Sequence, residues 1–297
     1  MRPQPFHEGE LEAQRRAGEA ARARSNGRAI SDEIVPGALA FVGQQPFFLA
    51  ATLDAAGRPW AWLVAGEPGF VRAPSVRSIL VHGDGLTLLP AGLREQLAAD
   101  GRIGLLFFEP ATRRRLRVNG TARLAGDGGF EVDVMQAFPN CPKYIQRRAL
   151  SSTPPAARSA RRSSGTHLSA ELVARIQLSD VFFVASRGPD GVLDVSHRGG
   201  PPGFVAARGD GTLLVPDYPG NSMFNTFGNL LRDPRASLLF PDFENGDVLS
   251  TTGRARIDFE DGSPEPGELA TGRSWSFEPA EWHLDEGSLP FRLVRLP

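Results

Sequence analysis

The sequence predicts a mainly β protein in which two small β-barrels with flanking helices follow one another along one chain. Its 297 residues include 33 glycines and 25 prolines, so turns are frequent and a helical bundle is disfavoured. Hydrophobic residues make up 41% and charged residues 23% of the chain, which is enough apolar material for two ordinary cores. The third observation is an internal repeat.

Two blocks of the first half recur in the second half at nearly the same offset. Residues 57–71 align with 191–205 at a shift of 134, with six of 15 positions identical. Residues 102–124 align with 235–257 at a shift of 133. The one-residue difference implies an indel in a loop, where a duplicated fold tolerates it. We therefore expect both halves to share one fold.

The same order of elements is expected in each half. The first half has a helix over 33–44 that Ser31 can cap, then apolar strands FFLAATLD, 60–65, FVRAP, 78–81, 86–89, 103–108 and LRVNGTARL. The second half has a helix over 169–178 capped by Ser169, a short helix over 221–232, and strands over 181–186, 192–196, 203–207, 211–215, 236–240 and 247–257. Short strands with few helices favour a small barrel over a parallel sheet, because closure removes exposed edges.

The join and the two ends of the chain have their own compositions. Residues 151–168 are rich in Ser, Pro, Ala and Arg without an apolar period, which is typical of an exposed linker. This divides the chain into 1–150, the linker, and 169–297. A helix over about 8–24 has a weak apolar face, so loose packing is expected. The tail from Gly272 contains two Trp and two Phe and is expected to wrap back onto a barrel.

Charge and cysteine content exclude several classes of protein. Thirty-three basic residues oppose 34 acidic ones, which disfavours a nucleic-acid binder. Cys141 is the only cysteine, so no internal disulfide can form, and the N-terminal segment lacks the apolar region of a signal peptide. No apolar run approaches the roughly 20 residues of a membrane helix. These features predict a cytoplasmic protein that does not enter membranes.

Three segments carry a resemblance to a known family. DVSHRGGPPGFV, LLVPDYPGNSMFNTFGNLLRDPRASLLF and NCPKYIQRR resemble the pyridoxamine 5'-phosphate oxidase-related, FMN-binding split-barrel proteins. The resemblance covers most of the chain from Phe6 onward. It implies two tandem split β-barrels that form a pseudo-dimer, with FMN, or alternatively a deazaflavin, bound between them. A monomeric pseudo-dimer and a homodimer of tandem chains both remain open.

The second half holds the residues expected to bind the cofactor phosphate. Ser196 and Arg198 precede a flexible turn that begins at Gly199, where the backbone can approach an anion closely. Asn221, Ser222 and Asn225 open a short helix whose N-terminal amides favour a phosphate. The related oxidases have a basic residue after the equivalent serine, whereas Met223 stands here. The alternative is that these polar residues cap the helix and that Arg198 is a surface charge.

The first half lacks this chemistry. Trp62 and Val64 stand where the second half has Ser196 and Arg198, and PAGLREQLAADG replaces the helix-opening polar segment. We therefore expect one principal flavin site, with the first barrel as its structural partner and one wall. A second, degenerate site is the alternative.

Residues 140–144 contribute a further group of candidates. By resemblance, Lys143 and Tyr144 lie near the flavin across the barrel interface, although a turn with a solvated lysine is an equal interpretation. No histidine adjoins Cys141, so a nucleophilic thiol is disfavoured. The five histidines show no metal spacing, although His197 adjoins the predicted site. No pair of carboxylates stands out as an acid/base couple, so the catalytic residues stay unassigned.

The functional expectation is an FMN-dependent oxidoreductase that acts on a small molecule, with NAD(P)H as a candidate electron donor. Vitamin B6 oxidation is disfavoured, because the tail has Trp282-His283 and ends with Arg292 and Arg295, without the Arg/His pair that grips the substrate phosphate in true pyridoxamine phosphate oxidases. The alternative from another class is a non-catalytic protein that binds a flavin, a deazaflavin or haem.

Overall fold

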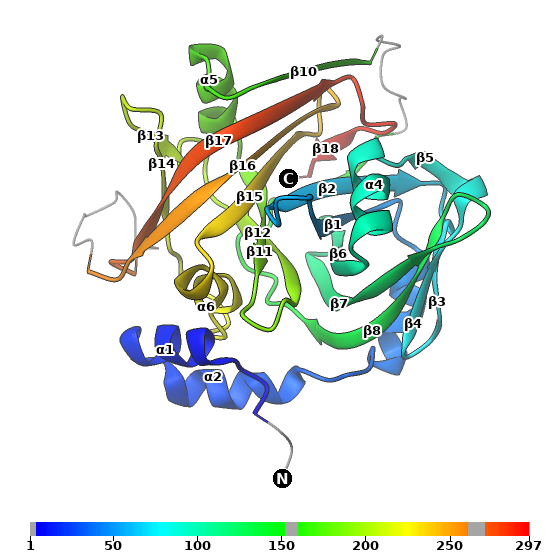
Figure 1. Cartoon of the computed structure of the whole chain (residues 1–297), viewed down its shortest axis with the longest axis horizontal. Coiled ribbons are helices and arrows are strands. Elements are labelled where there is room, and N and C mark those ends of the chain that lie inside the picture. The colour runs from blue at the N-terminus through cyan, green and yellow to red at the C-terminus, as the bar shows by residue number, and fades with distance from the viewer. Residues whose placement is uncertain (1–3, 152–159, 261–270, 297) are drawn as a thin grey trace.

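The computed structural model describes residues 4–151, 160–260 and 271–296. Two curled antiparallel sheets lie side by side, one from each half of the chain (Figure 1). The first has the order β3-β4-β8-β7-β6-β1-β2-β5. Its strands are β1 (Phe47–Leu53), β2 (Pro59–Gly66), β3 (Val71–Ser75), β4 (Ser78–Val81), β5 (Leu86–Leu88), β6 (Arg102–Glu109), β7 (Arg114–Leu124) and β8 (Phe130–Pro139).

The second sheet has the order β12-β11-β15-β16-β17-β14-β13. Its strands are β11 (Val181–Arg187), β12 (Leu193–Gly199), β13 (Ala206–Ala207), β14 (Leu213–Pro216), β15 (Arg235–Asp242), β16 (Asp247–Asp258) and β17 (Ser274–Glu286). A further strand, β10 (Arg161–Gly165), pairs with β17, and β9 (Arg148–Leu150) pairs with β18 (Leu293–Arg295).

The two sheets have the same strand order, which confirms the duplication. The strands β1, β2, β3, β4, β6, β7 and β8 correspond in turn to β11 to β17. With this replacement the first order, read from its other end, becomes the second order, apart from the extra strand β5. Even the irregularities repeat. A β-bulge lies at Gly120 in the β7–β8 pair and at Gly253 in the β16–β17 pair, which are 133 positions apart. Each half is therefore a split barrel of the predicted kind.

The three largest hydrophobic clusters hold the two barrels together. Phe48 and Val64 belong to the interior of the first barrel, and Phe182 and Trp275 to that of the second. A third cluster contains alternate residues of β1, β2 and β6 together with those of β11, β12 and β15. All seven residues of β1 are buried, because one face lines the barrel and the other meets its partner. The two barrels therefore form a pseudo-dimer with a hydrophobic interface.

The helices differ most from expectation. The N-terminal segment forms α1 (Glu8–Arg16) and α2 (Ala20–Asn26), which lie beside α6 (Asn225–Arg232). Loose packing was the wrong expectation: Ala13 is fully buried, and the α1–α6 crossing is so close that a Cβ on Gly228 would meet Glu10 at 2.4 Å. A weak apolar face suffices here because backbone contact replaces large side chains.

Other helices and strands also differ from the prediction in their bounds. The helix expected over 33–44 is a 3₁₀ turn (Pro36–Ala38) followed by α3 (Leu39–Gly43), whereas α5 (Ala170–Leu178) has the expected cap from Ser169. Strands β8 and β10 and helix α4 (Ala91–Ala99) were not expected. The tail does return to the second barrel, as β17.

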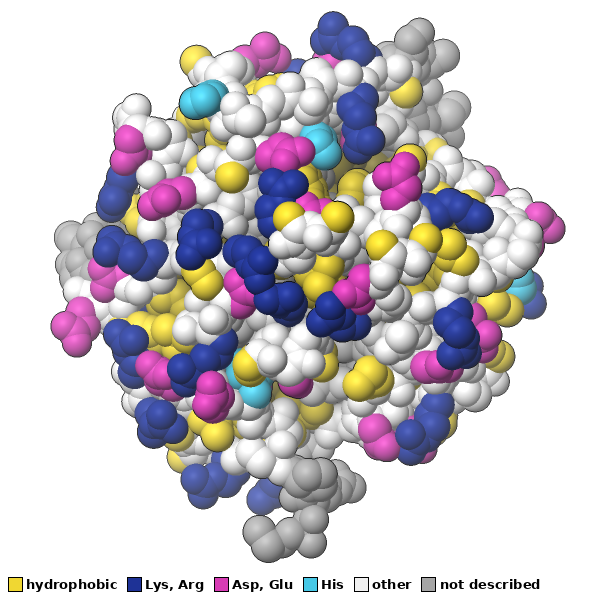
Figure 2. Space-filling view, viewed as in Figure 1, with side chains coloured by type: hydrophobic (Ala, Val, Ile, Leu, Met, Phe, Trp, Pro, Cys, Tyr) yellow, Lys and Arg dark blue, Asp and Glu magenta, His cyan; other side chains and the backbone are white. Residues whose placement is uncertain are grey.

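The surface agrees with the balanced charge of the sequence. Basic and acidic side chains are interspersed across the face shown in Figure 2. Within the described ranges, no helix is both long and apolar enough to cross a membrane.

Candidate functional site

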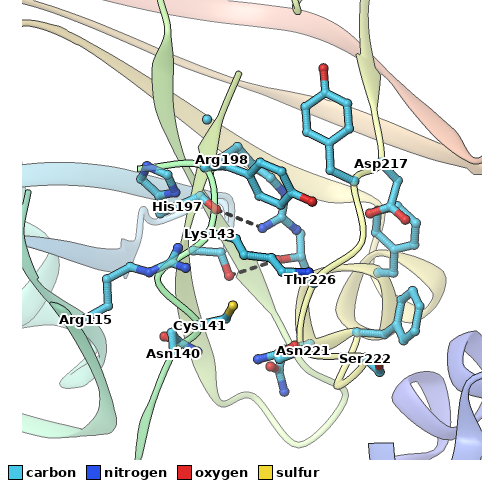
Figure 3. A pocket seen from close by; sticks show the side chains of 18 of the residues that line it. Arg115, Asn140, Cys141, Lys143, His197, Arg198, Asp217, Asn221, Ser222 and Thr226 are labelled. Carbon is cyan, nitrogen blue, oxygen red and sulfur yellow. Dashed lines mark hydrogen bonds between the residues drawn. The ribbon is translucent and has the colours of Figure 1, made fainter. Parts of the chain in front are cut away.

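A pocket lies between the two barrels where β7 of the first faces β12 and α6 of the second (Figure 3). Leu116 and Val118 of β7 point into the first barrel, so Arg115 and Arg117, which alternate with them, point outward to the pocket. The hollow encloses about 940 Å³ including its open mouth. Both halves of the chain are therefore needed to form it.

All eight residues predicted to bind the cofactor line this pocket. They come from four segments of the chain: the turn after β8, the end of β12, the loop before α6 and the first residue of α6. The full set is Lys143, Tyr144, Ser196, Arg198, Gly199, Asn221, Ser222 and Asn225. Their meeting in one place is a finding about position. Their role in binding stays a prediction.

Arg198 is the most available cation that the sequence predicted. Its guanidinium donates one hydrogen bond, to the carbonyl oxygen of His197 at 3.1 Å, and no carboxylate of the described chain lies within ion-pair distance. Burial lowers the pKa of Arg198, while Asp217 acts in the opposite direction. The pocket therefore presents a charge whose solvation is reduced and whose hydrogen-bonding capacity is largely unused.

Ser196 occupies the same wall but is already engaged. Its hydroxyl lies 2.5 Å from a guanidinium nitrogen of Arg117 and 3.0 Å from the hydroxyl of Thr226. Arg117 in turn forms a buried ion pair with Asp194 at 2.9 Å. Ser196 thus belongs to a network that joins β7 of one barrel to β12 of the other.

The segment before α6 departs from the predicted phosphate cradle. The hydroxyl of Ser222 donates to Glu19 at 2.5 Å, and the amide of Asn225 donates to Glu10. Glu10 lies in α1 and Glu19 directly precedes α2, and burial raises the pKa of Glu10. The side chains expected to face a phosphate are therefore hydrogen-bonded to acids in this structure, because α1 and α2 pack where the sequence suggested a loose helix.

Lys143 and Tyr144 reach the pocket from the first half. The Tyr144 hydroxyl donates to the Pro219 carbonyl at 2.9 Å, and the Lys143 ammonium donates to the same oxygen at 3.3 Å. A Cβ on Gly199 would lie 2.0 Å from the Tyr144 carbonyl oxygen, so only glycine lets this segment pack on the end of β12.

Backbone strain is concentrated at the pocket. Four non-glycine residues of the described chain have positive φ, and three of them, Tyr144, Ser222 and Phe224, line this pocket. Left-handed conformations of such residues cost on the order of 1 kcal/mol or more and persist where the surroundings enforce them. Strain of this kind is enriched at binding sites.

Arg115 is a pocket residue that the sequence analysis missed. Its Nε is fully buried without a hydrogen-bond partner, and burial together with repulsion from Arg117 lowers its pKa to about 9. A signal was present, because the repeat aligns Arg115 and Arg117 with Val248 and Ser250. A search of the first half for polar residues that have no counterpart in the second half would have identified these two arginines, which the fold does not require.

His197 lines the pocket as a neutral, buried ring. It stacks on Phe108 with ring centroids 5.2 Å apart, and its Nε2 is buried without a partner. Burial, followed by repulsion from Arg115, holds its pKa well below the usual value. No group of His, Cys, Asp or Glu in the part of the chain that the structure describes could hold a metal ion.

The equivalent position in the first half is also hollow but differs in chemistry. That pocket is lined by Trp62, Val248 and Ser250, which the repeat aligns with Ser196, Arg115 and Arg117. Its one arginine, Arg162, is paired with Asp285 at 2.8 Å. The two equivalent pockets therefore differ in their lining residues, while the phosphate-binding role assigned to Ser196 and Arg198 stays a prediction.

Comparison with known proteins gives a family match. The family model described as pyridoxamine 5'-phosphate oxidase matches residues 34–154 and, a second time, residues 168–284. No curated protein matches the chain significantly.

Similar solved structures include a pyridoxamine 5'-phosphate oxidase-related, FMN binding protein from Nostoc punctiforme (12% identity, 41% of this chain and 81% of that one, TM-score 0.28). They also include an F420 reductase (16% identity, 38% and 94%, TM-score 0.28) and HupZ from Group A Streptococcus (12% identity, 38% and 89%, TM-score 0.31).

Proposed function

The chain belongs to the pyridoxamine 5'-phosphate oxidase family, and from that premise we propose that it is an FMN-dependent oxidoreductase whose cofactor lies in the pocket between its barrels. The observation that carries the proposal is Arg198, a partly buried guanidinium without a carboxylate partner in a pocket that both barrels form. A phosphate monoester carries nearly two negative charges and accepts the bidentate hydrogen bonds that arginine offers.

The residues present fit such a group. Arg198 and Lys143 bring positive charge that no described carboxylate neutralises by an ion pair, and the buried Nε of Arg115 has no acceptor. The rings of Tyr144 and Tyr218, 5.2 Å apart, add an aromatic wall suited to a flat ligand. FMN, when bound, supplies hydride or electron transfer through its isoalloxazine ring.

The chain's own contribution is binding and shielding. Arg198 holds the phosphate, Lys143 adds a second positive charge, and the strained backbone at Tyr144 fixes the segment that carries it. His197 stays neutral and keeps the floor of the site apolar. We assign no catalytic residue, and the substrate and the electron donor are left to experiment. We also propose a cytoplasmic protein, since its single cysteine cannot form an internal disulfide, and a monomer in solution, since the chain supplies both barrels.

Absorbance of the purified protein tests the cofactor. FMN, a deazaflavin and haem have different spectra, and a deazaflavin or haem spectrum would replace FMN in the proposal. Bleaching of bound FMN by stoichiometric NAD(P)H would support an oxidoreductase over a carrier.

Substitution of Arg198 tests the site. Because a charge-assisted hydrogen bond contributes about 1.5 to 3 kcal/mol, Arg198→Ala should weaken FMN binding about 10- to 100-fold. Arg198→Lys should recover part of it, since lysine offers a point charge without the planar fork. Binding of riboflavin, which lacks the phosphate, should be nearly unchanged. The matched control is Arg208→Ala, at an exposed arginine outside the pocket. Wild-type FMN affinity in Arg198→Ala at low salt would place the phosphate elsewhere.

A further inference from the structure

The helices α1 and α2 lie outside both barrels and hold the loop that precedes α6 (Figure 1). The side-chain amide of Asn26 donates to the Asn221 carbonyl oxygen at 2.6 Å, and that of Gln14 donates to the Met223 carbonyl oxygen at 3.0 Å. Because both acceptors are backbone groups, these bonds fix the path of the loop. The N-terminal helices therefore set the conformation of a segment that lines the pocket.

The same loop has a strained backbone. Ser222 and Phe224 have φ values of 64° and 58°, in the left-handed region that favours glycine. Each such residue costs on the order of 1 kcal/mol or more unless its surroundings enforce the conformation. The contacts with α1 and α2 offset this cost, so loosening them would let the loop change conformation.

Glu19, which directly precedes α2, occupies two donors that line the pocket. Its carboxylate accepts from the Ser222 hydroxyl at 2.5 Å and from the Arg273 guanidinium at 3.1 Å. Figure 3 shows Ser222 at the end of the pocket nearest to the N-terminal helices. A hydroxyl and a guanidinium are also donors that a phosphate group uses. The chain's own carboxylate and a phosphate in this pocket would therefore compete for them.

The contact made by Glu19 can open without leaving a buried charge unpaired. The side chain of Glu19 is 24% exposed, so its carboxylate can turn to solvent, and Arg273 keeps Asp217 as a partner at 2.9 Å. Gly18, between the helices, has a φ of 71° and open space around its Cα. Within α2 only Ala23 is buried, whereas α1 is anchored by its close crossing with α6. The movable part is therefore α2 together with Glu19.

We propose that Glu19 and α2 form an autoinhibitory latch on the pocket. In the closed state Glu19 holds Ser222 and Arg273, and a phosphate-bearing ligand displaces it, binds both donors and releases α2. This rests on the proposed function, which puts the cofactor phosphate in this pocket, and deepens it by naming how access to the site is regulated.

Hydrogen–deuterium exchange of the α2 backbone amides tests the latch. Saturating FMN should make the amides of residues 20–26 exchange at least about threefold faster, whereas riboflavin, which lacks the phosphate, should leave them unchanged. Ligands ordinarily slow exchange near their sites, so faster exchange is specific to a released segment. Exchange in α2 that is unchanged or slower with FMN bound would overturn the proposal. The amides of β11 should exchange alike in all samples, which shows that the fold is intact.

Glu19→Gln tests the carboxylate itself. The change removes the charge and keeps the size, so FMN should bind at least about fivefold more tightly while riboflavin binding is unchanged. The matched control is Glu12→Gln, which removes the same charge from α1 at a residue paired with Arg232 at 2.8 Å, outside the pocket. An FMN affinity of Glu19→Gln equal to or below that of wild type would mean that Glu19 only orients Arg273, and the latch would be rejected.

The ligand-free protein separates the latch from the proposed function. Without ligand, Glu19→Gln should exchange faster than wild type in α2, whereas Glu12→Gln should not, and equal rates in all three proteins would overturn the latch. If flavin binds while α2 stays protected, the latch alone fails. If no flavin binds, the proposed function fails, and inorganic phosphate takes the place of FMN in the exchange experiment. Faster exchange of α2 with phosphate would then support the latch, and unchanged exchange would overturn it.

Discussion

Asp194→Ala should be among the most damaging single changes in the protein, although Asp194 was not among the predicted site residues. Its carboxylate accepts from Arg117 at 2.9 Å, and each side chain is only 5% exposed. The pair joins β7 of the first barrel to β12 of the second, so its loss acts on the interface. Removing one partner leaves the other charge buried and uncompensated, which costs about 3 to 5 kcal/mol.

The assay is equilibrium unfolding in urea, with the free energy of unfolding compared between variants. Strand β7 supplies a matched control in the exposed pair Arg123–Asp133, whose side chains are 62% and 52% exposed. Asp133→Ala should cost less than about 1 kcal/mol. The double variant Asp194→Ala with Arg117→Leu should recover part of the loss, because no unpaired charge remains. A cost for Asp194→Ala no larger than that for Asp133→Ala would refute the reasoning.

Two further predictions concern the repeated bulge and the neutral histidine. A Cβ at Gly120 or Gly253 would lie 2.1 Å from a carbonyl oxygen of the neighbouring strand. Each Gly→Ala change should therefore lower the free energy of unfolding by about 1 to 3 kcal/mol in the same urea assay. The control is Gly209→Ala, which should be near neutral because a Cβ there meets nothing within 4 Å. His197 has a depressed pKa when folded, so the unfolded chain binds its proton first and stability falls as pH drops through about 6.5. His197→Phe should remove up to about 1.4 kcal/mol of the stability that wild type loses between about pH 7.5 and 5.5, and an equal loss in both proteins would mean that His197 protonates freely in the fold.

Local patterns in the sequence predicted the strands well where apolar runs were continuous. Strands such as β1 and β11 are buried on both faces, so they stand out as unbroken apolar segments. β8 alternates buried and exposed residues along Phe130–Pro139, and its charged positions made it resemble a loop. The α1–α6 contact was unpredictable from periodicity because it depends on Gly228, whose missing side chain matters only once the two helices are placed together.

The same distinction between local and tertiary signals decides which residues of the candidate site could be predicted. Residues on β12 and before α6 were found because glycines, serines and asparagines cluster locally in the chain. Arg115 and Arg117 were missed because, along β7 alone, polar residues at every second position from Arg115 to Arg123 are typical of a solvated face. Only the docking of the second barrel buries these positions, 77 residues or more from the partners Asp194 and Ser196. A tertiary event of that kind leaves no mark in β7 alone, and only the comparison with the aligned Val248 and Ser250 signals it.

Tandem duplication explains why one pocket can carry charge while its equivalent does not. In a symmetric homodimer, every substitution appears in both sites at once, so an arginine added to one pocket is added to the other. In this chain the two sites vary independently. The first-half pocket has an indole, Trp62, whose Nε1 donates to Thr52 at 2.8 Å and whose ring stacks near Trp60 at 6.0 Å. This packing stabilises the interior of the first barrel without the desolvation cost of buried guanidinium groups. The stability gained there offsets the destabilisation caused by the strained backbone and the unpaired guanidinium groups in the other pocket, where a ligand can compensate the charge.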